Sequence, residues 1–353
     1  MKKYNLLLLS FLMLIAFTNY AQNEVNVGDS TALDGLKALE YYNVGIEKFN
    51  AKDYQNAILQ FDTAIIISKS YEKAYFNRGS AKYHLKDYQN ALLDFDTSIV
   101  LNPDTSEAYY LRGRTHQEFK NDTAALKDFN AAIRVDDTNA DAYYYRAVYL
   151  FLEEKYTNAI ADYTAAIKNQ PKHAYAYNDR GSAKKQLKDF TGAITDYKKA
   201  IEIDPSLAFV YNNLGSALRN NKQYDEAIAN YDKAISLKDD YYVAYNNRGF
   251  TKHEKGDYKN AIEDFNDAIR LKASYTFAYN NRAASKYKLK DYKGAEKDCS
   301  NALILDQSYA AAYLNRGIAR EMLRKQDEAC EDWNKAASLG LKNGKSFVQQ
   351  SCN

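Results

Sequence analysis

The stretch Glu72–Thr105, EKAYFNRGSAKYHLKDYQNALLDFDTSIVLNPDT, decides the fold, because most of the chain repeats it. Copies of this unit follow one another from residue 38 to residue 343 without insertion or deletion. The nine copies are 38–71, 72–105, 106–139, 140–173, 174–207, 208–241, 242–275, 276–309 and 310–343. A fixed period of this length indicates stacked repeats, each of which buries its apolar face against its neighbours.

Within each copy, apolar and small residues recur at helical spacing. Counted from the first residue of a copy, the fourth place is always Tyr, the eighth is Gly or Ala, and the twentieth is always Ala. The twenty-fourth place is aromatic except in the eighth copy, which has Cys299. Places four and eight share one face of a helix, and places twenty, twenty-four and twenty-seven share one face of another. Each copy is therefore predicted to be two helices that approach closely at the small residues.

Short breaks separate the predicted helices. Lys-Asp or Gly-Asp before an aromatic residue, as in Lys52-Asp53-Tyr54, marks the turn inside a copy and offers a cap for the second helix. Asn102-Pro103 and Asp204-Pro205 mark the ends of second helices, because the residue before a proline is pushed out of the helical region.

This pattern resembles the tetratricopeptide repeat (TPR) family. An aromatic residue four places before a Gly, an Ala twelve places after that Gly and an aromatic residue four places later match the family in spacing over residues 38–343. The resemblance implies an all-α fold, a right-handed superhelical solenoid of nine helix-turn-helix TPR repeats. One departure is the seventh place, which is usually apolar in the family and is Arg in seven copies here.

The ends of the chain carry separate signals. Lys2 and Lys3 precede an apolar run that is too short to span a bilayer comfortably, so residues 1–21 are interpreted as a secretory signal peptide. A single membrane anchor is the alternative. With the signal peptide, the mature chain is exported to the periplasm or the extracellular space and keeps no stable membrane span. Residues 22–37 are polar and are predicted to be a flexible lead-in that is ordered only near the first helix.

Residues 344–353 form a short amphipathic segment, and a solenoid needs a cap over its last exposed face. We therefore predict a C-terminal capping helix. Cys330 and Cys352 lie on the last repeat and on this cap, and in an exported protein we hypothesise a disulfide between them, worth on the order of 3 kcal/mol. Cys299 is predicted to be a small buried core residue.

Charge and motif content exclude several classes of function. Without residues 1–21 the chain has 46 basic and 46 acidic residues, which argues against nucleic acid as a partner. The four His lie at different places of different copies, without metal-ligand spacing. No phosphate-binding Gly loop or nucleophile–base arrangement stands out. We predict a protein that is not an enzyme and uses no cofactor and no metal.

The seventh and twenty-third places vary together. Copies one and six have Val44 and Leu214 at the seventh place, and they have Gln60 and Asn230 at the twenty-third. All other copies have Arg at the seventh place and Asp at the twenty-third. This covariation predicts seven structural Arg–carboxylate bridges inside repeats. They include Arg78 with Asp94 and Arg248 with Asp264.

The family resemblance also implies a ligand site. In TPR arrays, the second, fifth, sixth, ninth, twelfth and thirteenth places of the first helices line the concave groove. Asn occupies the sixth place at Asn43, Asn77, Asn213, Asn247, Asn281 and Asn315, and the fifth place at Asn178, Asn212, Asn246 and Asn280. These columns resemble the asparagine ladders of long TPR superhelices.

An amide both donates and accepts hydrogen bonds, so an Asn column suits the backbone of an extended peptide of any sequence. Phe209 and Phe277 at the second place would supply apolar pockets beside the column. The alternative is that these Asn are solvated helix-surface residues.

These observations predict a protein–protein interaction scaffold. It would hold an extended segment of a protein partner of unknown identity in its groove, during assembly of an envelope or secreted complex. Two alternatives stay open: a structural role through self-association of the superhelix, and a glycan-acting envelope protein that uses the Tyr-rich groove. The fold itself does not choose among them.

Overall fold

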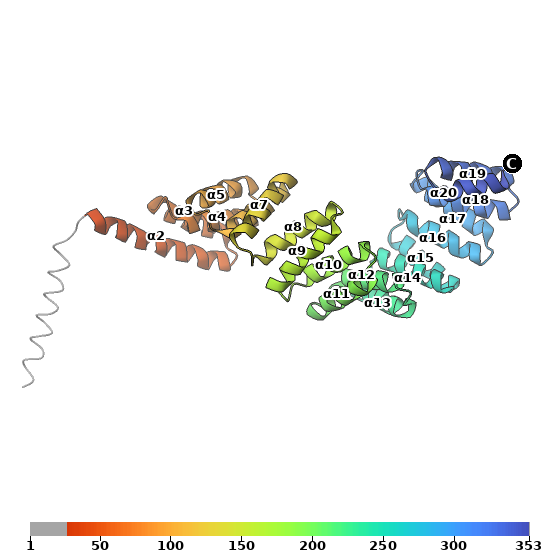
Figure 1. The fold of residues 1–353 in the computed structure, drawn as a ribbon, viewed down its shortest axis with the longest axis horizontal. Helices are drawn as coiled ribbons and strands as arrows, with labels where there is room; N and C mark the ends of the chain where they lie inside the picture. The colour runs from red at the N-terminus through yellow and green to blue at the C-terminus, as the bar shows by residue number, and fades with distance from the viewer. Residues whose placement is uncertain (1–26, 353) are drawn as a thin grey trace, which may run out of the picture. The chain divides into compact units, whose positions relative to one another are not determined.

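The computed structural model describes residues 27–352, which form helices and contain no strand (Figure 1). The first helices of the copies are α2 (Val27–Asn50), α4 (Glu72–His84), α6 (Ser106–Glu118), α8 (Ala140–Leu152), α10 (Ala174–Gln186), α12 (Ala208–Asn220), α14 (Tyr242–Lys255), α16 (Thr276–Lys288) and α18 (Ala310–Met322). The second helices are α3 (Tyr54–Ile67), α5 (Tyr88–Leu101), α7 (Asp122–Val135), α9 (Tyr156–Asn169), α11 (Phe190–Ile203), α13 (Tyr224–Leu237), α15 (Tyr258–Leu271), α17 (Tyr292–Leu305) and α19 (Gln326–Ser338), and α20 (Lys342–Ser351) follows. The all-α repeat fold is confirmed, and the predicted signal peptide, residues 1–21, lies outside the described residues.

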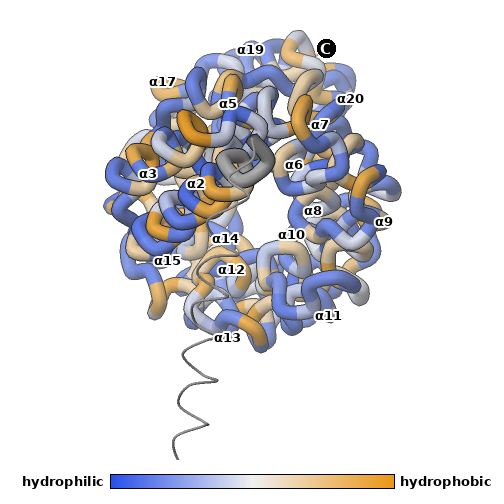
Figure 2. The backbone as a smooth tube through the Cα atoms, turned by 90° about the vertical axis from the view of Figure 1, so that its left-hand side faces the viewer, coloured by the Kyte–Doolittle hydropathy of each residue, from blue (hydrophilic) through white to orange (hydrophobic). Residues whose placement is uncertain are grey.

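The chain divides inside α8 into two compact units, one ending at Tyr149 and one beginning at Leu150. In the second unit, consecutive helices from α9 to α20 pack on one another. The first helices α10, α12, α14, α16 and α18 also contact one another in turn. Figure 2 shows α10, α12 and α14 on the inner side of this unit, and α11, α13 and α15 on its outer side.

The helix of the first copy is longer than predicted. It begins at Val27, so residues 27–37 are helical and the prediction of a flexible lead-in over 22–37 is wrong for this part. The physical reason is that Ala32, Leu33 and Leu36 favour a helix, and the single Gly35 opposes it by only about 1 kcal/mol.

Two features of the predicted Lys-Asp and Gly-Asp breaks separate the helices of a copy: a residue with positive φ and a helix cap. The residue at the fifteenth place adopts a left-handed conformation, with φ of 62° at Lys188 and 91° at Gly256. In these breaks, except at Asp87, the Asp that follows caps the second helix, as Asp257 does by accepting a hydrogen bond from the backbone N–H of Asn260. The turn therefore ends one helix and starts the next within two residues.

Close packing at the eighth and twenty-fourth places sets the distance between the two helices of a copy. A Cβ added at Gly249 would lie 2.9 Å from Cε1 of Phe265 and 3.0 Å from the carbonyl oxygen of Ala261. The eighth copy differs at both places. It has Ala283 instead of Gly at the eighth place, and the small Cys299 instead of an aromatic ring at the twenty-fourth. Cys299 is a buried free thiol, and burial raises its pKa.

A charged cluster joins the two helices of a copy and the preceding copy. In the seventh copy, Arg248 donates from Nη2 to Asp264 (2.6 Å) and from Nη1 to Asp232 of the sixth copy (2.6 Å). Lys252 adds an ion pair to Asp264 (2.8 Å), and the guanidinium lies over the ring of Tyr245 (5.3 Å). Burial alone would lower the pKa of Arg248, but its bonds to the two carboxylates raise it.

The Arg–Asp bridge recurs along both units, in the pairs Arg78–Asp94, Arg112–Asp128, Arg180–Asp196, Arg282–Asp298 and Arg316–Asp332. The seventh predicted pair, Arg146 and Asp162, has one member in each unit and stays a prediction. The sixth copy has Leu214 and Leu218 at the places of the two cations, and both lie in an apolar cluster.

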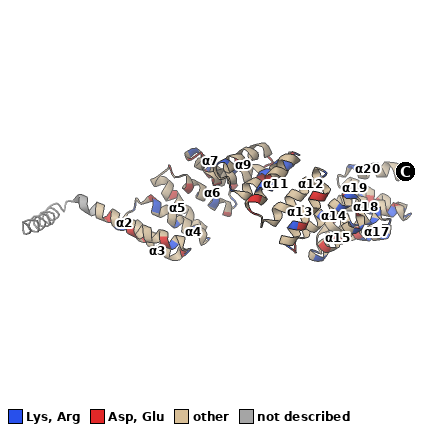
Figure 3. Ribbon diagram, turned by 90° about the horizontal axis from the view of Figure 1, so that it is seen from below, with Lys and Arg blue, Asp and Glu red and all other residues tan. Residues whose placement is uncertain are grey.

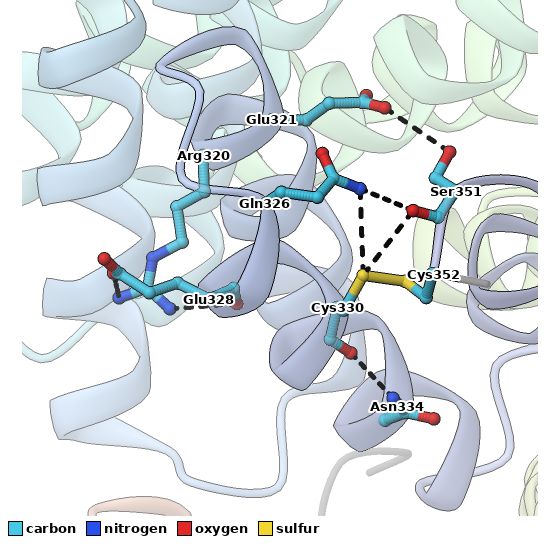
Figure 4. Close-up of a disulfide and its surroundings, with 8 residues drawn as sticks. All are labelled: Arg320, Glu321, Gln326, Glu328, Cys330, Asn334, Ser351 and Cys352. Carbon is cyan, nitrogen blue, oxygen red and sulfur yellow. Dashed lines mark hydrogen bonds and ion pairs between the residues drawn. A yellow bond between two sulfur atoms is a disulfide. The ribbon is translucent and has the colours of Figure 1, made fainter.

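The last repeat is covered by α20, as predicted for a cap, although the helix begins two residues before the expected segment 344–353. Phe347 stacks on Trp333 with ring centroids 4.9 Å apart. A Cβ at Gly344 would lie 2.7 Å from the backbone nitrogen of Ala337, so α20 approaches α19 very closely. Cys330 and Cys352 form a disulfide that joins the two helices (Figure 4).

We expect Gly249→Ala to lower the free energy of unfolding by about 1–3 kcal/mol, because the added methyl group overpacks the contact with Phe265. Thermal denaturation followed by circular dichroism measures this. Gly35→Ala is the control, since a Cβ there meets no atom within 4 Å. Equal stability of Gly249→Ala and the wild-type protein would contradict the packing argument.

We expect Asp264→Ala to lower the free energy of unfolding by about 3–5 kcal/mol, because the two half-buried cations Arg248 and Lys252 lose their carboxylate partner. The triple variant Arg248→Leu/Lys252→Leu/Asp264→Asn reproduces the residues of the sixth copy and should recover part of this loss. Urea denaturation compares the two variants. If the triple variant is no more stable than Asp264→Ala, the charges do not act as one cluster.

We expect Cys352→Ser to destabilise the docking of α20 by about 3 kcal/mol, because the cross-link closes a loop with a sequence separation of 22. Thiol labelling under native conditions should modify no Cys of the wild-type protein and Cys330 of the variant. Labelling of Cys330 in the wild-type protein before reduction would show that the bond is not formed.

Candidate functional site

The sixth-place Asn of the second unit form a hydrogen-bonded ladder with the fifth-place Asn. Each sixth-place Nδ2 donates to Oδ1 of the fifth-place Asn in the preceding copy. The four rungs are Asn213 to Asn178 (3.0 Å), Asn247 to Asn212 (3.0 Å), Asn281 to Asn246 (3.0 Å) and Asn315 to Asn280 (2.8 Å). The ladder therefore links the first helices α10 to α18 side chain to side chain.

The fifth-place Asn are buried, with exposed fractions of 4–7 %. This differs from the expectation that both columns present their amides to a ligand. Neighbouring residues on a helix point about 100° apart. The fifth place therefore faces the adjacent first helix, while the sixth place faces away from that helix and is partly exposed to solvent. The fifth-place side chains thus position the sixth-place amides.

The sixth-place amides keep binding capacity after the rung is made. Asn213, Asn247, Asn281 and Asn315 are half-buried, and each uses one of its two N–H donors in the rung. Among residues 27–352, their second N–H and their Oδ1 have no hydrogen-bond partner. Each side chain is held in place and still offers one donor and one acceptor.

The first unit has a different column. Asn77 donates to the hydroxyl of Tyr42 (3.1 Å) at the same sequence separation as a rung, and Asn43 is exposed on α2. In the third and fourth copies, Tyr110 at the fifth place and Tyr145 at the sixth place stand where a rung would have two Asn. Their ring centroids lie 5.8 Å apart. The regular amide ladder is a property of the second unit.

Aromatic side chains border the ladder on the side of the helix N-termini. Tyr175 stacks on Phe209 (5.8 Å), and Tyr175 is 48 % exposed. Phe277 is 52 % exposed and contacts Tyr275 (5.6 Å) and Tyr309 (5.4 Å). The predicted Phe209 and Phe277 therefore lie at the site, as parts of larger aromatic groups.

Basic side chains border the ladder nearer the helix C-termini. Lys185 and Arg219 occupy the twelfth place of α10 and α12. The ammonium of Lys185 has no hydrogen-bond or ion-pair partner in the described part of the chain, and burial together with Arg219 lowers its pKa. Arg219 lies over Phe250 (4.9 Å) with its Nε 3.6 Å from Glu254. This basic pair was not predicted from the sequence, although a comparison of the twelfth place across copies would have found it.

A small cavity of about 210 Å³ opens between α14, α16 and α18. Its walls include His253, Tyr287, Asn315 and Ile318. His253 Nδ1 lies 2.8 Å from Ser285 Oγ, and burial, with the charge of Lys288 nearby, lowers its pKa. The volume is below that of a typical small-molecule site.

Within residues 27–352, no three His, Cys, Asp or Glu side chains are arranged to hold a metal ion, and no helix is long and apolar enough to cross a membrane. Acidic and basic residues are interspersed along the helices (Figure 3).

Comparisons with known proteins agree with this architecture. Models described as TPR repeat or tetratricopeptide repeat match residues 181–222, 206–274, 76–140 and 110–163. The crystal structure of a tetratricopeptide repeat protein from Parabacteroides merdae matches with a TM-score of 0.59 at 18% identity, over 70% of this chain and 99% of that chain. The structure of PilW, a type IV pilus biogenesis factor, matches with a TM-score of 0.55 at 20% identity, over 60% and 98%.

At these identities the solved structures show a shared fold alone. No curated protein matches the sequence. The matched segments extend over residues 76–163 and 181–274, more than half of the chain, and they fall on the helix pairs described above. The chain therefore belongs to the tetratricopeptide repeat family.

Proposed function

We propose that the protein is a non-catalytic interaction scaffold whose second unit binds an extended polypeptide segment along the asparagine ladder. The observation that carries this proposal is the state of Asn213, Asn247, Asn281 and Asn315: each is fixed by a rung and still has one donor and one acceptor. An extended backbone offers a donor and an acceptor at each residue, so it is complementary to this array.

The rungs favour binding because they orient the amides before the ligand arrives. A solvated Asn on a helix surface samples several rotamers, and ordering such a side chain opposes binding by about 0.5–1.5 kcal/mol. Here the buried partners Asn178, Asn212, Asn246 and Asn280 restrict the rotamers in the free protein. The alternative, that these four Asn are ordinary solvated residues of the helix surface, does not explain why each of them is bonded to a buried Asn of the preceding copy.

We propose that the scaffold acts outside the cytoplasm, in assembly of an envelope or secreted complex. Two observations support export: the charged and apolar pattern of residues 1–21, and the disulfide between Cys330 and Cys352. Structural disulfides persist in oxidising compartments and are rare where thiols are kept reduced. The partner is an exposed, extended segment of another protein.

We expect the variant Asn213→Ala/Asn247→Ala/Asn281→Ala/Asn315→Ala to lose its partner in a pull-down from an extract of the cell envelope. The matched control is Ser236→Ala/Arg270→Ala/Ile304→Ala/Ser338→Ala, which changes exposed residues of the second helices in the same copies. The control should retain the partner. A partner held equally by the ladder variant and by the wild-type protein would contradict binding at the ladder.

The ladder variant also needs a folding check, because each lost rung leaves a buried amide oxygen unsatisfied at about 1–3 kcal/mol. Circular dichroism at the assay temperature shows whether the variant is folded. The single variant Asn281→Ala removes one rung only and should weaken binding while remaining fully folded. Size-exclusion chromatography with light scattering separates this proposal from self-association of the chain.

A further inference from the structure

We propose that the ladder selects an extended segment in which acidic and apolar side chains alternate, and that α10 and α12 carry this selection. The inference rests on the proposed function and adds the chemical class of the ligand. Three features meet on these two helices: the stacked pair Tyr175 and Phe209, the rung from Asn213 to Asn178, and the basic pair Lys185 and Arg219.

The three features are separated along the helix axis. The second, sixth and twelfth places differ by four and six residues, which corresponds to about 6 Å and about 9 Å at 1.5 Å per residue. The ninth place between the rung and the basic pair holds the small residues Ser182 and Ser216. Around the helix, the twelfth place lies about 20° from the fifth, so the basic pair lies on the same side of α10 and α12 as the buried rung partners, and the aromatic pair lies nearer the sixth place. Along the helix axis the surface therefore has an aromatic edge, an amide centre and a basic edge, with room between the last two.

An extended segment that crosses these helices along the ladder meets both edges. Successive side chains of a strand point to opposite sides, so one set points to the helix N-termini and the other to the C-termini. With its backbone on the amides, one set lies against Tyr175 and Phe209 and the other reaches Lys185 and Arg219. Apolar side chains suit the first edge and carboxylates the second.

The charges around the basic pair favour an anion. Lys185 has no carboxylate partner in the described part of the chain, and the neighbouring charge that acts on it is the positive charge of Arg219. Arg219 has one acidic neighbour, Glu254, at 3.6 Å. Asp179, the other acidic side chain here, accepts from Asn178 (2.8 Å) at the rung, about 9 Å along α10 from Lys185. A ligand carboxylate would complete the pair.

Lys185 also lies in the last turn of α10, where the helix dipole favours a cation. The helix therefore offsets part of the repulsion from Arg219 without using a counter-ion. A half-buried cation stabilised in this way gains more from a ligand carboxylate than one that already has an ion pair.

The test uses the purified protein and fluorescence anisotropy with three ten-residue peptides, blocked at both ends and labelled with fluorescein. The first alternates Asp and Leu, the second has five Asp followed by five Leu, and the third alternates Lys and Leu. We expect the alternating acidic peptide to bind at least tenfold more tightly than the other two. If the first two peptides bind with equal affinity, the proposal that the site selects alternating side chains is wrong.

Substitutions then locate the selection. We expect Lys185→Gln/Arg219→Gln to weaken binding of the alternating acidic peptide at least tenfold and to flatten its salt dependence. The matched control is Lys198→Gln/Lys233→Gln, which removes the same charge from exposed positions on the second helices of the same copies. The single variant Lys185→Gln breaks no hydrogen bond or ion pair among the described residues, and circular dichroism at the assay temperature shows whether it is folded. Equal effects of the two double variants would overturn the role of the basic pair.

The inference and the proposed function fail in different ways. If the natural partner depends on the ladder amides but the alternating peptide binds no better than its isomer, the inference is wrong and the scaffold proposal stands. If neither the partner nor any peptide depends on the amides, both are wrong.

Discussion

Close contact between a small residue at the eighth place and a ring at the twenty-fourth sets the geometry on which the rest of the structure depends. Gly249 and Phe265 leave no room for one extra carbon atom. Where the ring is replaced by Cys299, Ala283 fills part of the space. Because this spacing recurs from copy to copy, the first helices α10, α12, α14, α16 and α18 of the second unit contact one another at the same register, and their side chains one copy apart meet repeatedly.

The charged clusters fix the orientation of neighbouring helices, whereas the packing fixes the distance between them. Arg248 contacts Asp264 in its own copy and Asp232 in the preceding one, so one guanidinium constrains three helices. A guanidinium has a planar set of donors, which suits two carboxylates at defined angles better than a flexible ammonium does. The sixth copy shows that an apolar solution also works, because Leu214 and Leu218 pack into an apolar cluster at the same places.

Much of this architecture could be predicted from the sequence, because nine copies serve as an internal alignment. The period predicted the helix pairs, and the covariation at Arg248 and Asp264 identified a contact that the structure contains. The link to Asp232 was missed, because its place varies in residue type among copies. The burial of Asn212 was missed as well, since a one-residue step around a helix cannot be resolved without knowing how neighbouring first helices are rotated.

In the proposed complex, the rungs and the two edges of the ladder recognise different parts of the ligand. A ladder of identical amides reads only the backbone, so by itself it accepts any extended segment. Discrimination has to come from residues that differ between copies, because specificity is a difference in affinity between ligands. Tyr175 and Lys185 differ from their counterparts in other copies and lie on opposite sides of the rung at Asn178. In the proposed complex, such a surface distinguishes two ligands of equal composition by whether their acidic and apolar side chains alternate.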